Sequence, residues 1–293
     1  MRLPVILLIA TCAAWAGDAR FNGRWDISGN HAAWLEITGA ETDKPAGRYV
    51  SAFDGDMNVI EQISIRKGEL EFGWPSRKLQ YSARLVAGKL EGMKPSKWVG
   101  VRAPRISEKD DGSWHEGRTV TLFDGKNLAG WQAVGGGAPS GWSVDDGTLS
   151  GNGRANDIVT VDKFWNFVLH VEFKVAPHSN SGVGLRGRYE VQVLDDYGRP
   201  PNTHGNGALY ARILPSGNAS KPADQWQTFD VRLIGRQVTI ALNGKTIIDK
   251  REIEGLTAIA VDASEATPGP IYLQGDHGPV QFRNLRLTEL TRK

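Results

Sequence analysis

Short runs of alternating hydrophobic and polar residues recur along most of the chain, and Gly, Asn or Asp separates them. No long segment shows the 3.6-residue apolar period of an amphipathic helix. Alternation with a period of two indicates a half-buried strand, because successive side chains of a strand point to opposite faces of the sheet. The pattern therefore predicts an all-β protein.

The first region, residues 20–104, contains short and evenly spaced runs, with Lys67-Gly68 and Ala87-Gly88 at hairpin-turn positions. This spacing predicts a small antiparallel β-domain, either a barrel or an open sheet. The expected strands are Gly23–Ile27, Ala33–Thr38, Gly47–Ala52, Val59–Arg66, Glu69–Trp74, Leu79–Leu85, Lys89–Gly92 and Lys97–Arg102.

Residues 105–118 are polar, charged and without periodicity, which predicts a linker. Longer runs follow in residues 119–293, including a strong hairpin signal at Asn243-Gly244. This many antiparallel strands in one region predicts a two-sheet jelly roll or lectin-type sandwich. The expected strands are Gly141–Val144, Thr148–Ser150, Asp157–Thr160, Phe167–Val175, Gly182–Gly187, Tyr189–Leu194, Gln227–Ile234, Gln237–Leu242, Lys245–Asp249, Gly269–Gln274 and Val280–Leu290.

The N-terminus predicts an export signal over residues 1–16. Arg2 precedes a short apolar run, and Ala14-Trp15-Ala16 is an A-x-A cleavage site. The run is too short to span a bilayer, and no later stretch approaches the roughly 20 apolar residues that spanning requires. We expect a periplasmic or extracellular protein without a transmembrane segment. A lipid tether on Cys12 is the alternative, although Thr11 is larger than the residue that normally precedes such a cysteine.

Composition excludes several classes of function. Cys12 is the single cysteine, so the cleaved chain would have neither a disulfide framework nor a zinc-thiolate site. The net charge of +2 is spread without runs, which argues against nucleic acid as a partner. The 10 Trp residues point instead toward carbohydrate, because indole faces are apolar platforms for sugar rings, although most Trp in a β-protein belong to the core.

Alternation also assigns candidate site residues to faces. In residues 167–175 the odd positions are apolar, which turns Glu172 away from the core, and in residues 189–193 the same pattern turns Glu190 and Gln192 outward. If the two strands lie in one sheet, these three side chains line one polar surface suited to sugar hydroxyls. The alternative is the ordinary solvated face of an antiparallel sheet.

Further polar candidates lie beside these strands. Arg186 precedes the strand that carries Glu190, and Asn180 precedes the strand before it. Gln274 is followed by a glycine-bracketed loop containing Asp276 and His277, where the histidine is suited to proton transfer near neutral pH. Local structural roles, such as charge neutralisation or a satisfied turn histidine, are equally compatible with the pattern. Gly-x-Ser-x-Gly and His-Glu-x-x-His motifs are absent from the sequence, which removes the commonest serine-hydrolase and zinc-protease readings.

Four strings occur in order over residues 119–290. They are Leu122-Phe123-Asp124-Gly125-Lys126-Asn127-Leu128-Ala129-Gly130-Trp131, Trp142-Ser143-Val144-Asp145-Asp146-Gly147-Thr148-Leu149, Tyr189-Glu190-Val191-Gln192-Val193 and Gly275-Asp276-His277-Gly278-Pro279-Val280-Gln281-Phe282-Arg283-Asn284. Together they resemble the 3-keto-disaccharide hydrolase domain family. The resemblance implies a concanavalin A-like jelly roll, an exported bacterial protein and hydrolysis of glycosides whose sugar carries a ketone at carbon 3. Residues 20–104 lie outside the resemblance.

The implied chemistry needs a base, an acid and a group that stabilises an enediolate, because the ketone acidifies the hydrogen on carbon 2. We assign Glu190 as base or metal ligand and His277 as general acid or base. Arg186 and Gln192 would stabilise the oxyanion and orient the ring. A divalent cation held by Glu190 and His277 would polarise the ketone, although nothing in the spacing requires one. Further substrate-binding candidates are Glu172, Gln274, Asp276 and Asn180, with Asp276 orienting His277.

Three other functions remain open at this point. The same sandwich often binds glycans without chemistry, because fold does not fix function. A conventional glucanase would need two carboxylates, whereas residues 189–193 offer one carboxylate and one amide. The third alternative is a surface protein whose sandwich contacts other proteins.

Overall fold

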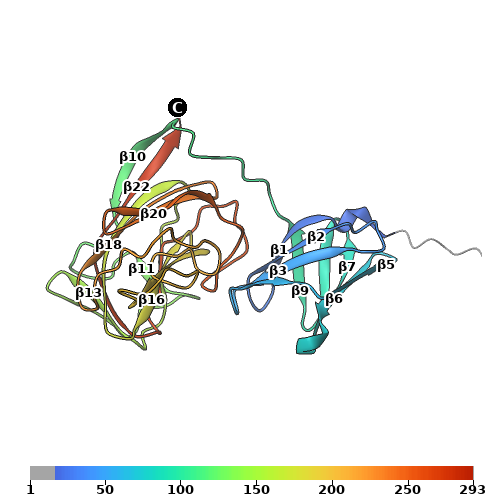
Figure 1. Cartoon of the computed structure of the whole chain (residues 1–293), viewed down its shortest axis with the longest axis horizontal. Coiled ribbons are helices and arrows are strands. Elements are labelled where there is room, and N and C mark those ends of the chain that lie inside the picture. The colour runs from blue at the N-terminus through green and yellow to red at the C-terminus, as the bar shows by residue number, and fades with distance from the viewer. Residues whose placement is uncertain (1–16, 293) are drawn as a thin grey trace, which may run out of the picture.

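The computed structural model describes residues 17–292, which form two β-sheet units lying side by side (Figure 1). The predicted signal peptide, with Cys12, lies outside the described residues. Two short 3₁₀ helices, η1 (Ala19–Phe21) and η2 (Pro75–Arg77), interrupt the strands. Within the described part of the chain, no helix is long and apolar enough to cross a membrane. The prediction of an all-β protein is confirmed.

The N-terminal unit is one nine-stranded antiparallel sheet in the order β4-β3-β2-β1-β9-β8-β7-β6-β5. Its curved sheet encloses a core rich in aromatic side chains, among them Phe21, Trp25, Phe72 and Trp74. Sequence neighbours pair from β1 to β4 and from β5 to β9, whereas β1 pairs with β9 and the neighbours β4 and β5 form the two edges of the sheet. The strands are β1 (Gly23–Ser28), β2 (Ala33–Thr38), β3 (Ala46–Ser51), β4 (Met57–Val59), β5 (Gln62–Arg66), β6 (Glu69–Trp74), β7 (Leu79–Val86), β8 (Lys89–Lys94) and β9 (Trp98–Arg102).

The C-terminal unit is a β-sandwich, as predicted. An eight-stranded sheet has the order β12-β13-β22-β15-β18-β19-β20 with β10 also paired to β22, and a five-stranded sheet has the order β11-β14-β21-β16-β17. The strands are β10 (Trp114–Thr121), β11 (Trp131–Ala133), β12 (Trp142–Asp145), β13 (Thr148–Asn152), β14 (Ile158–Thr160), β15 (Phe167–Val175), β16 (Asn180–Leu185), β17 (Tyr189–Leu194), β18 (Gln227–Ile234), β19 (Gln237–Leu242), β20 (Lys245–Glu252), β21 (Tyr272–Leu273) and β22 (Pro279–Arg292).

A continuous hydrophobic core separates the two sheets. Alternate residues of β15, such as Leu169 and Val171, face alternate residues of β17, such as Val191 and Val193, and all four are fully buried. Burial of this kind is the main favourable contribution to folding, at roughly 25 cal/mol per Å² of apolar surface. The outer face of each sheet is consequently left for polar residues.

The predicted linker over residues 105–118 is corrected at its C-terminal end, because Trp114 to Arg118 begin β10 and pair with the last strand, β22. The preceding connection is also tied to the sandwich. Asp110 accepts a hydrogen bond from Arg232 at 2.9 Å, and Glu108 accepts one from Trp165 at 3.0 Å. A partner strand far along the chain completes this element, so local sequence showed no strand signal there.

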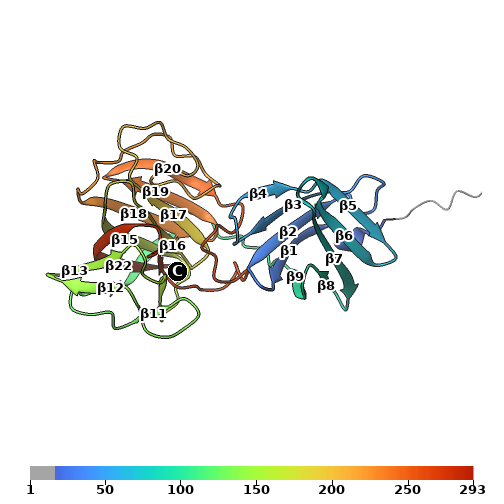
Figure 2. The same ribbon diagram turned by 90° about the horizontal axis from the view of Figure 1, so that it is seen from below.

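The two units meet along the long loop between β20 and β21, residues 253–271. Trp34 and Val50 of the N-terminal sheet pack against Leu256 and Ala263 of this loop in a separate buried cluster. Figure 2 shows β3 and β4 on the side of the N-terminal unit that faces the sandwich. The loop is therefore held between the two units.

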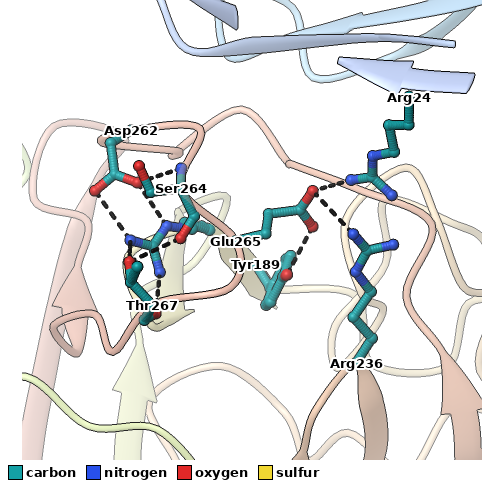
Figure 3. A network of polar contacts seen from close by, with 8 residues as sticks. Arg24, Tyr189, Arg236, Asp262, Ser264, Glu265 and Thr267 are labelled. Carbon is teal, nitrogen blue, oxygen red and sulfur yellow. Dashed lines mark hydrogen bonds and ion pairs between the residues drawn. The ribbon is translucent and has the colours of Figure 1, made fainter. Parts of the chain in front are cut away.

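A buried carboxylate lies at this junction. The Glu265 side chain is 1% exposed and forms ion pairs with Arg24 of β1 and, at 3.6 Å, with Arg236 of the sandwich (Figure 3). The Tyr189 hydroxyl donates to the same carboxylate at 2.6 Å. A buried charge with three partners is well compensated, and removal of one partner is costly. Glu265 thus connects the N-terminal sheet to the first residue of β17.

Candidate functional site

The candidate site is the outer face of the five-stranded sheet. Cross-strand register places Glu190 of β17 opposite Gly184 of β16, which lies opposite Tyr272 of β21. The next row on the same face contains Gln192 opposite Gly182. Directly paired residues of antiparallel strands share a face. The side chains of Glu190 and Gln192 therefore point outward, as predicted.

Two glycines make room for the acidic side chain and its neighbours. A Cβ atom at Gly182 would collide with the carboxylate of Glu190. A Cβ atom at Gly184 would collide with the side chain of Ile259 and with Cβ of Tyr272. Glycine within a strand often marks a place where another group approaches closely, and here that group is the candidate acid and its apolar neighbours.

Loops cover this face more completely than alternation alone predicts. Tyr210 donates its backbone N–H to the carbonyl of Glu190 at 3.0 Å, and the backbone N–H of Gln192 donates to the carbonyl of Ala208 at 3.0 Å. From the interdomain loop, the Thr257 hydroxyl accepts the backbone N–H of Glu190 at 3.0 Å. As a result Glu190 is only 3% exposed and Gln192 only 4%.

Burial changes the acidity of this carboxyl group. Burial, the larger cause, and the nearby negative charge of Asp157 together raise the pKa of Glu190 to about 8. In the amide orientation that satisfies both of its ends, Gln192 donates to Oε1 of Glu190 at 3.1 Å and to the carbonyl of Ser181 at 3.2 Å. A carboxyl group that titrates near neutral pH is well matched to removing a proton from carbon.

A second acidic group stands next to the first. Asp157 accepts hydrogen bonds from the Tyr272 hydroxyl and from the backbone N–H of Gly275. Burial raises the pKa of Asp157, while the charge of His277 opposes that rise. Tyr272 lies in the row of Glu190 and Gly275 begins the loop of His277, so these two hydrogen bonds place Asp157 between the strand of the acid and the loop of the histidine. Sequence reasoning missed Asp157 and Tyr272, because Tyr272 lies within an apolar run and Asp157 precedes a strand of three residues.

The predicted loop histidine lies at the edge of this face. Nδ1 of His277 hydrogen-bonds to the Asp276 carboxylate, as expected for an orienting partner, and both side chains are about half exposed, at 50% and 51%. The backbone N–H of Asn180 donates to the His277 carbonyl at 3.1 Å, which ties the loop to β16. His277 is thus open to solvent and ligand, whereas Glu190 is enclosed.

Two predicted binding residues have unused acceptors here. Oε1 of Gln274 and Oδ1 of Asn180 are both buried without a hydrogen-bond partner. Gln274 also donates its backbone N–H to the carbonyl of Gly182 at 3.0 Å, which places it in the row of Gln192. A buried acceptor without a partner costs about 1–3 kcal/mol, and a sugar hydroxyl would relieve that cost.

The structure corrects the assignment of Arg186. Its guanidinium is fully buried and donates to the carbonyl of Trp165 at 2.6 Å, to the carbonyl of Gly235 at 2.8 Å and to Oδ1 of Asn166 at 3.0 Å. Each of its three nitrogens is occupied inside the protein. Arg186 therefore stabilises the joint between β16 and β17, and its full burial keeps its remaining N–H groups away from a substrate oxyanion.

The structure also corrects the placement of Glu172. Its strand, β15, belongs to the eight-stranded sheet and not to the sheet of Glu190. Its carboxylate accepts from Arg283 at 2.7 Å and from Asn284 at 2.6 Å. Burial alone would raise the pKa of Glu172, but these hydrogen bonds outweigh it and hold the pKa below its usual value. The conditional prediction of one shared surface is wrong because the two strands lie in different sheets.

The N-terminal unit reaches the rim of the site. The His204 ring lies edge-on against Tyr210 at 4.7 Å, and its Nε2 atom is 3.8 Å from Asp56 of the β3–β4 loop. Burial raises the pKa of the Tyr210 phenol, and the charges of Glu190 and Asp56 add to the effect. Sequence analysis gave the N-terminal β-domain no part in the site.

The sequence left open whether the site holds a metal ion. Over residues 17–292, no group of three or more His, Cys, Asp or Glu side chains is arranged to hold one.

The fold and site together define a β-sandwich protein whose covered outer face holds a buried acid, buried amide acceptors without partners and an accessible histidine. Residues 118–288, more than half of the chain, match the family described as the 3-keto-alpha-glucoside-1,2-lyase-like domain. The chain therefore belongs to that family.

Individual relatives agree with this assignment. The chain is 26% identical over 166 residues to a 3-keto-disaccharide hydrolase of Bacteroides thetaiotaomicron, a match that covers 44% of this chain and 57% of that protein. A crystal structure of a candidate glycosyl hydrolase from Parabacteroides distasonis superimposes with a TM-score of 0.52 at 30% identity, covering 60% of this chain and 90% of the other. A second such structure from the same organism has a TM-score of 0.52 at 25% identity, covering 59% of this chain and 94% of the other.

Proposed function

We propose that the protein cleaves glycosides whose sugar carries a ketone at carbon 3, by elimination across carbons 1 and 2 followed by hydration. The observation that carries this proposal is Glu190, a carboxyl group enclosed on the outer face of the sheet with a pKa of about 8. The family description and the name of the Bacteroides relative support the same substrate class.

In the first step Glu190 takes the proton from carbon 2, and the electron pair of that C–H bond moves toward the ketone oxygen. The resulting enediolate then expels the glycosidic oxygen from carbon 1, which leaves a carbon 1–carbon 2 double bond. His277, held by Asp276, gives a proton to the departing oxygen. Gln192 donates to Oε1 of Glu190 and so orients the base, while the Tyr272 hydroxyl donates to Asp157.

Hydration runs through the same groups in reverse. His277 accepts a proton from the water that attacks carbon 1, and protonated Glu190 returns a proton to carbon 2. The sum of the two steps is one water consumed and one glycosidic bond broken. Gln274 and Asn180, whose buried oxygens lack partners, would accept hydroxyl protons of the bound sugar.

The test is turnover of 3-keto-trehalose by the wild-type protein, with unoxidised trehalose and 3-keto-trehalose deuterated at carbon 2 as comparison substrates. Elimination would release glucose, and the deuterated substrate should react more slowly in a single turnover because its C–D bond breaks in the first step. Turnover of trehalose at an equal rate, or equal single-turnover rates for the two keto substrates, would contradict the proposal. Binding of the keto sugar without any product would indicate a non-catalytic carbohydrate-binding domain instead.

We also propose that the chain is exported with cleavage after Ala16. The expected result is a shortened chain in the periplasm or medium of a bacterial host, determined by N-terminal sequencing. A Cys12→Ser variant should behave identically. Retention of the wild type, but not of this variant, in the membrane fraction would instead establish a lipid tether.

A further inference from the structure

A separate hollow opens at one end of the N-terminal sheet. Its volume is about 260 Å³. Four connections surround it: the β1–β2 turn near His31, the β3–β4 loop with Phe53, η2, and the β8–β9 turn at Pro95. The mouth of a barrel-like sheet is a frequent position for a ligand, because the strands are rigid and the turns supply side chains.

The floor of the hollow is aromatic and rigid. Tyr49, Trp74, Tyr81 and Trp98 line it, with the Tyr49 ring 5.7 Å from Trp74 and 5.3 Å from Tyr81. The indole N–H of Trp74 is bonded to the carbonyl of Val59 at 2.7 Å. Rings fixed in this way need little ordering when a ligand binds, which reduces the entropic cost of association.

The rim of the hollow carries polar side chains whose hydrogen-bonding groups are planar. Arg77 donates to Oδ1 of Asn58 at 2.8 Å, and Asn58 donates to Oδ2 of Asp54 at 3.3 Å. All three side chains line the hollow. Guanidinium, amide and carboxylate groups together offer donors and acceptors to vicinal hydroxyls.

Phe53 stands at the entrance with 77% of its surface exposed. Its ring lies 5.4 Å from that of His31, and both residues line the hollow. A large aromatic side chain left in water next to a hollow marks a contact surface, because that apolar area would be covered by a ligand. The flat apolar face of a sugar ring matches a phenyl ring of this kind.

We propose that this hollow binds one pyranose ring of a glycan. Aromatic walls with a small planar polar rim suit a sugar, whose faces are apolar and whose edge is hydroxylated. A long lipid chain does not fit a hollow of about 260 Å³ with a charged rim. The chain's net charge of +2, spread over its length, gives no electrostatic attraction for a polyanion.

The position of the hollow connects sugar binding there to the site on the sandwich. Its β3–β4 loop also carries Asp56, which lies 3.8 Å from His204 on the rim of the sandwich site. A glycan held in the hollow would keep its neighbouring residues close to that site, which raises their effective concentration. This second statement rests on the proposed function, whereas sugar binding by the hollow does not.

The experiment measures sugar binding by the full chain carrying Glu190→Gln, so that turnover does not interfere. Maltose, cellobiose and trehalose are titrated while saturation-transfer NMR and tryptophan fluorescence are recorded. We expect saturable binding of at least one of them, weakened about fivefold or more by Phe53→Ala, which corresponds to loss of one aromatic contact. Arg77→Ala should weaken binding as well, and Phe53→Trp should retain it.

Val59→Ala is the matched control, because Val59 is 73% exposed on the neighbouring strand but does not line the hollow. It should leave the affinity unchanged. The inference is overturned if none of the three sugars binds, or if binding survives Phe53→Ala and Arg77→Ala and is lost on Gln192→Ala, which would locate the sugar on the sandwich. The proposed function fails separately, through absence of turnover of 3-keto-trehalose by the wild type.

Discussion

The two sheets of the sandwich have similar strand patterns but very different outer faces. On β15, Glu172 and His170 are partly exposed and lie among polar partners, and Arg283 pairs with Glu172 at 2.7 Å. On β17, Glu190 and Gln192 are nearly buried, and no ion pair reaches Glu190 within residues 17–292. Alternation decides which way a side chain points, whereas the loops above a sheet decide whether that side chain is exposed to water or enclosed.

The largest expected effect is on catalysis. Glu190→Gln should lower kcat on 3-keto-trehalose by roughly 10²–10⁴-fold, because the amide keeps the shape but removes the base. Steady-state kinetics with circular dichroism as a folding check would measure this. Glu172→Gln serves as the matched substitution on the other sheet, and an equal loss in that variant would contradict the contrast between the two faces.

A large effect on stability is expected from Arg186. Arg186→Met should destabilise the fold by about 3 kcal/mol, since it leaves the carbonyls of Trp165 and Gly235 buried without their donor. Urea unfolding would measure the loss. The residual folded protein should retain its kcat, and a selective loss of kcat at unchanged stability would return Arg186 to a catalytic role.

The pH dependence should separate the two faces as well. With a pKa of about 8, Glu190 is mostly protonated at neutral pH, so in a His277→Gln variant, where no second ionisable group takes part in the reaction, kcat/KM should rise about tenfold per pH unit up to pH 8 and then level off. A flat profile between pH 6 and pH 8 would be incompatible with Glu190 as the base.

The same pKa predicts a trend in stability. Because the folded-state pKa of Glu190 is raised above its ordinary value of 4.5, its contribution is fully present below pH 4.5 and is lost as the pH rises through about 8. Glu190→Gln should therefore stabilise the protein more at pH 9 than at pH 5, as measured by thermal unfolding. An equal shift in Tm at both pH values would contradict burial of the acid.

The smallest effect is expected on the solvated face. Glu172→Gln should change the free energy of unfolding by less than about 1 kcal/mol, because partly exposed ion pairs contribute little. It should also leave kcat unaltered. Chemical denaturation in low and high salt would check the first statement, and a loss above 2 kcal/mol would show that Glu172 is less solvated than its surroundings suggest.

Sequence reasoning recovered what depends on local pattern. The bounds of β15, β17, β18 and β19 follow from alternation and from the Asn243-Gly244 turn, so the predicted and observed strands coincide there. The β-sandwich could be predicted for the same reason. The first strand of the sandwich, β10, could not be predicted, because it is stabilised by pairing with β22 at the other end of the sequence.

The site was recovered only in part, because pattern carries no information on which sheet a strand joins. Glu190 and Gln192 could be placed on an outer face, but Glu172 could not be excluded without knowing the strand order. Arg186 looked functional because it precedes a strand with a candidate acid, and its burial depends on Trp165 and Asn166, which are distant in sequence. No local pattern in the sequence indicated that the N-terminal unit would reach the rim of the site.

The Glu265 junction has a practical consequence for anyone who trims the protein. A fragment comprising only the family-matched residues would leave Glu265 without Arg24, and Leu256 without the indole of Trp34. The loop that carries Thr257 would then lose one of its two supports, so the excised sandwich should be a poor stand-in for the whole molecule in crystallisation trials and inhibitor screens.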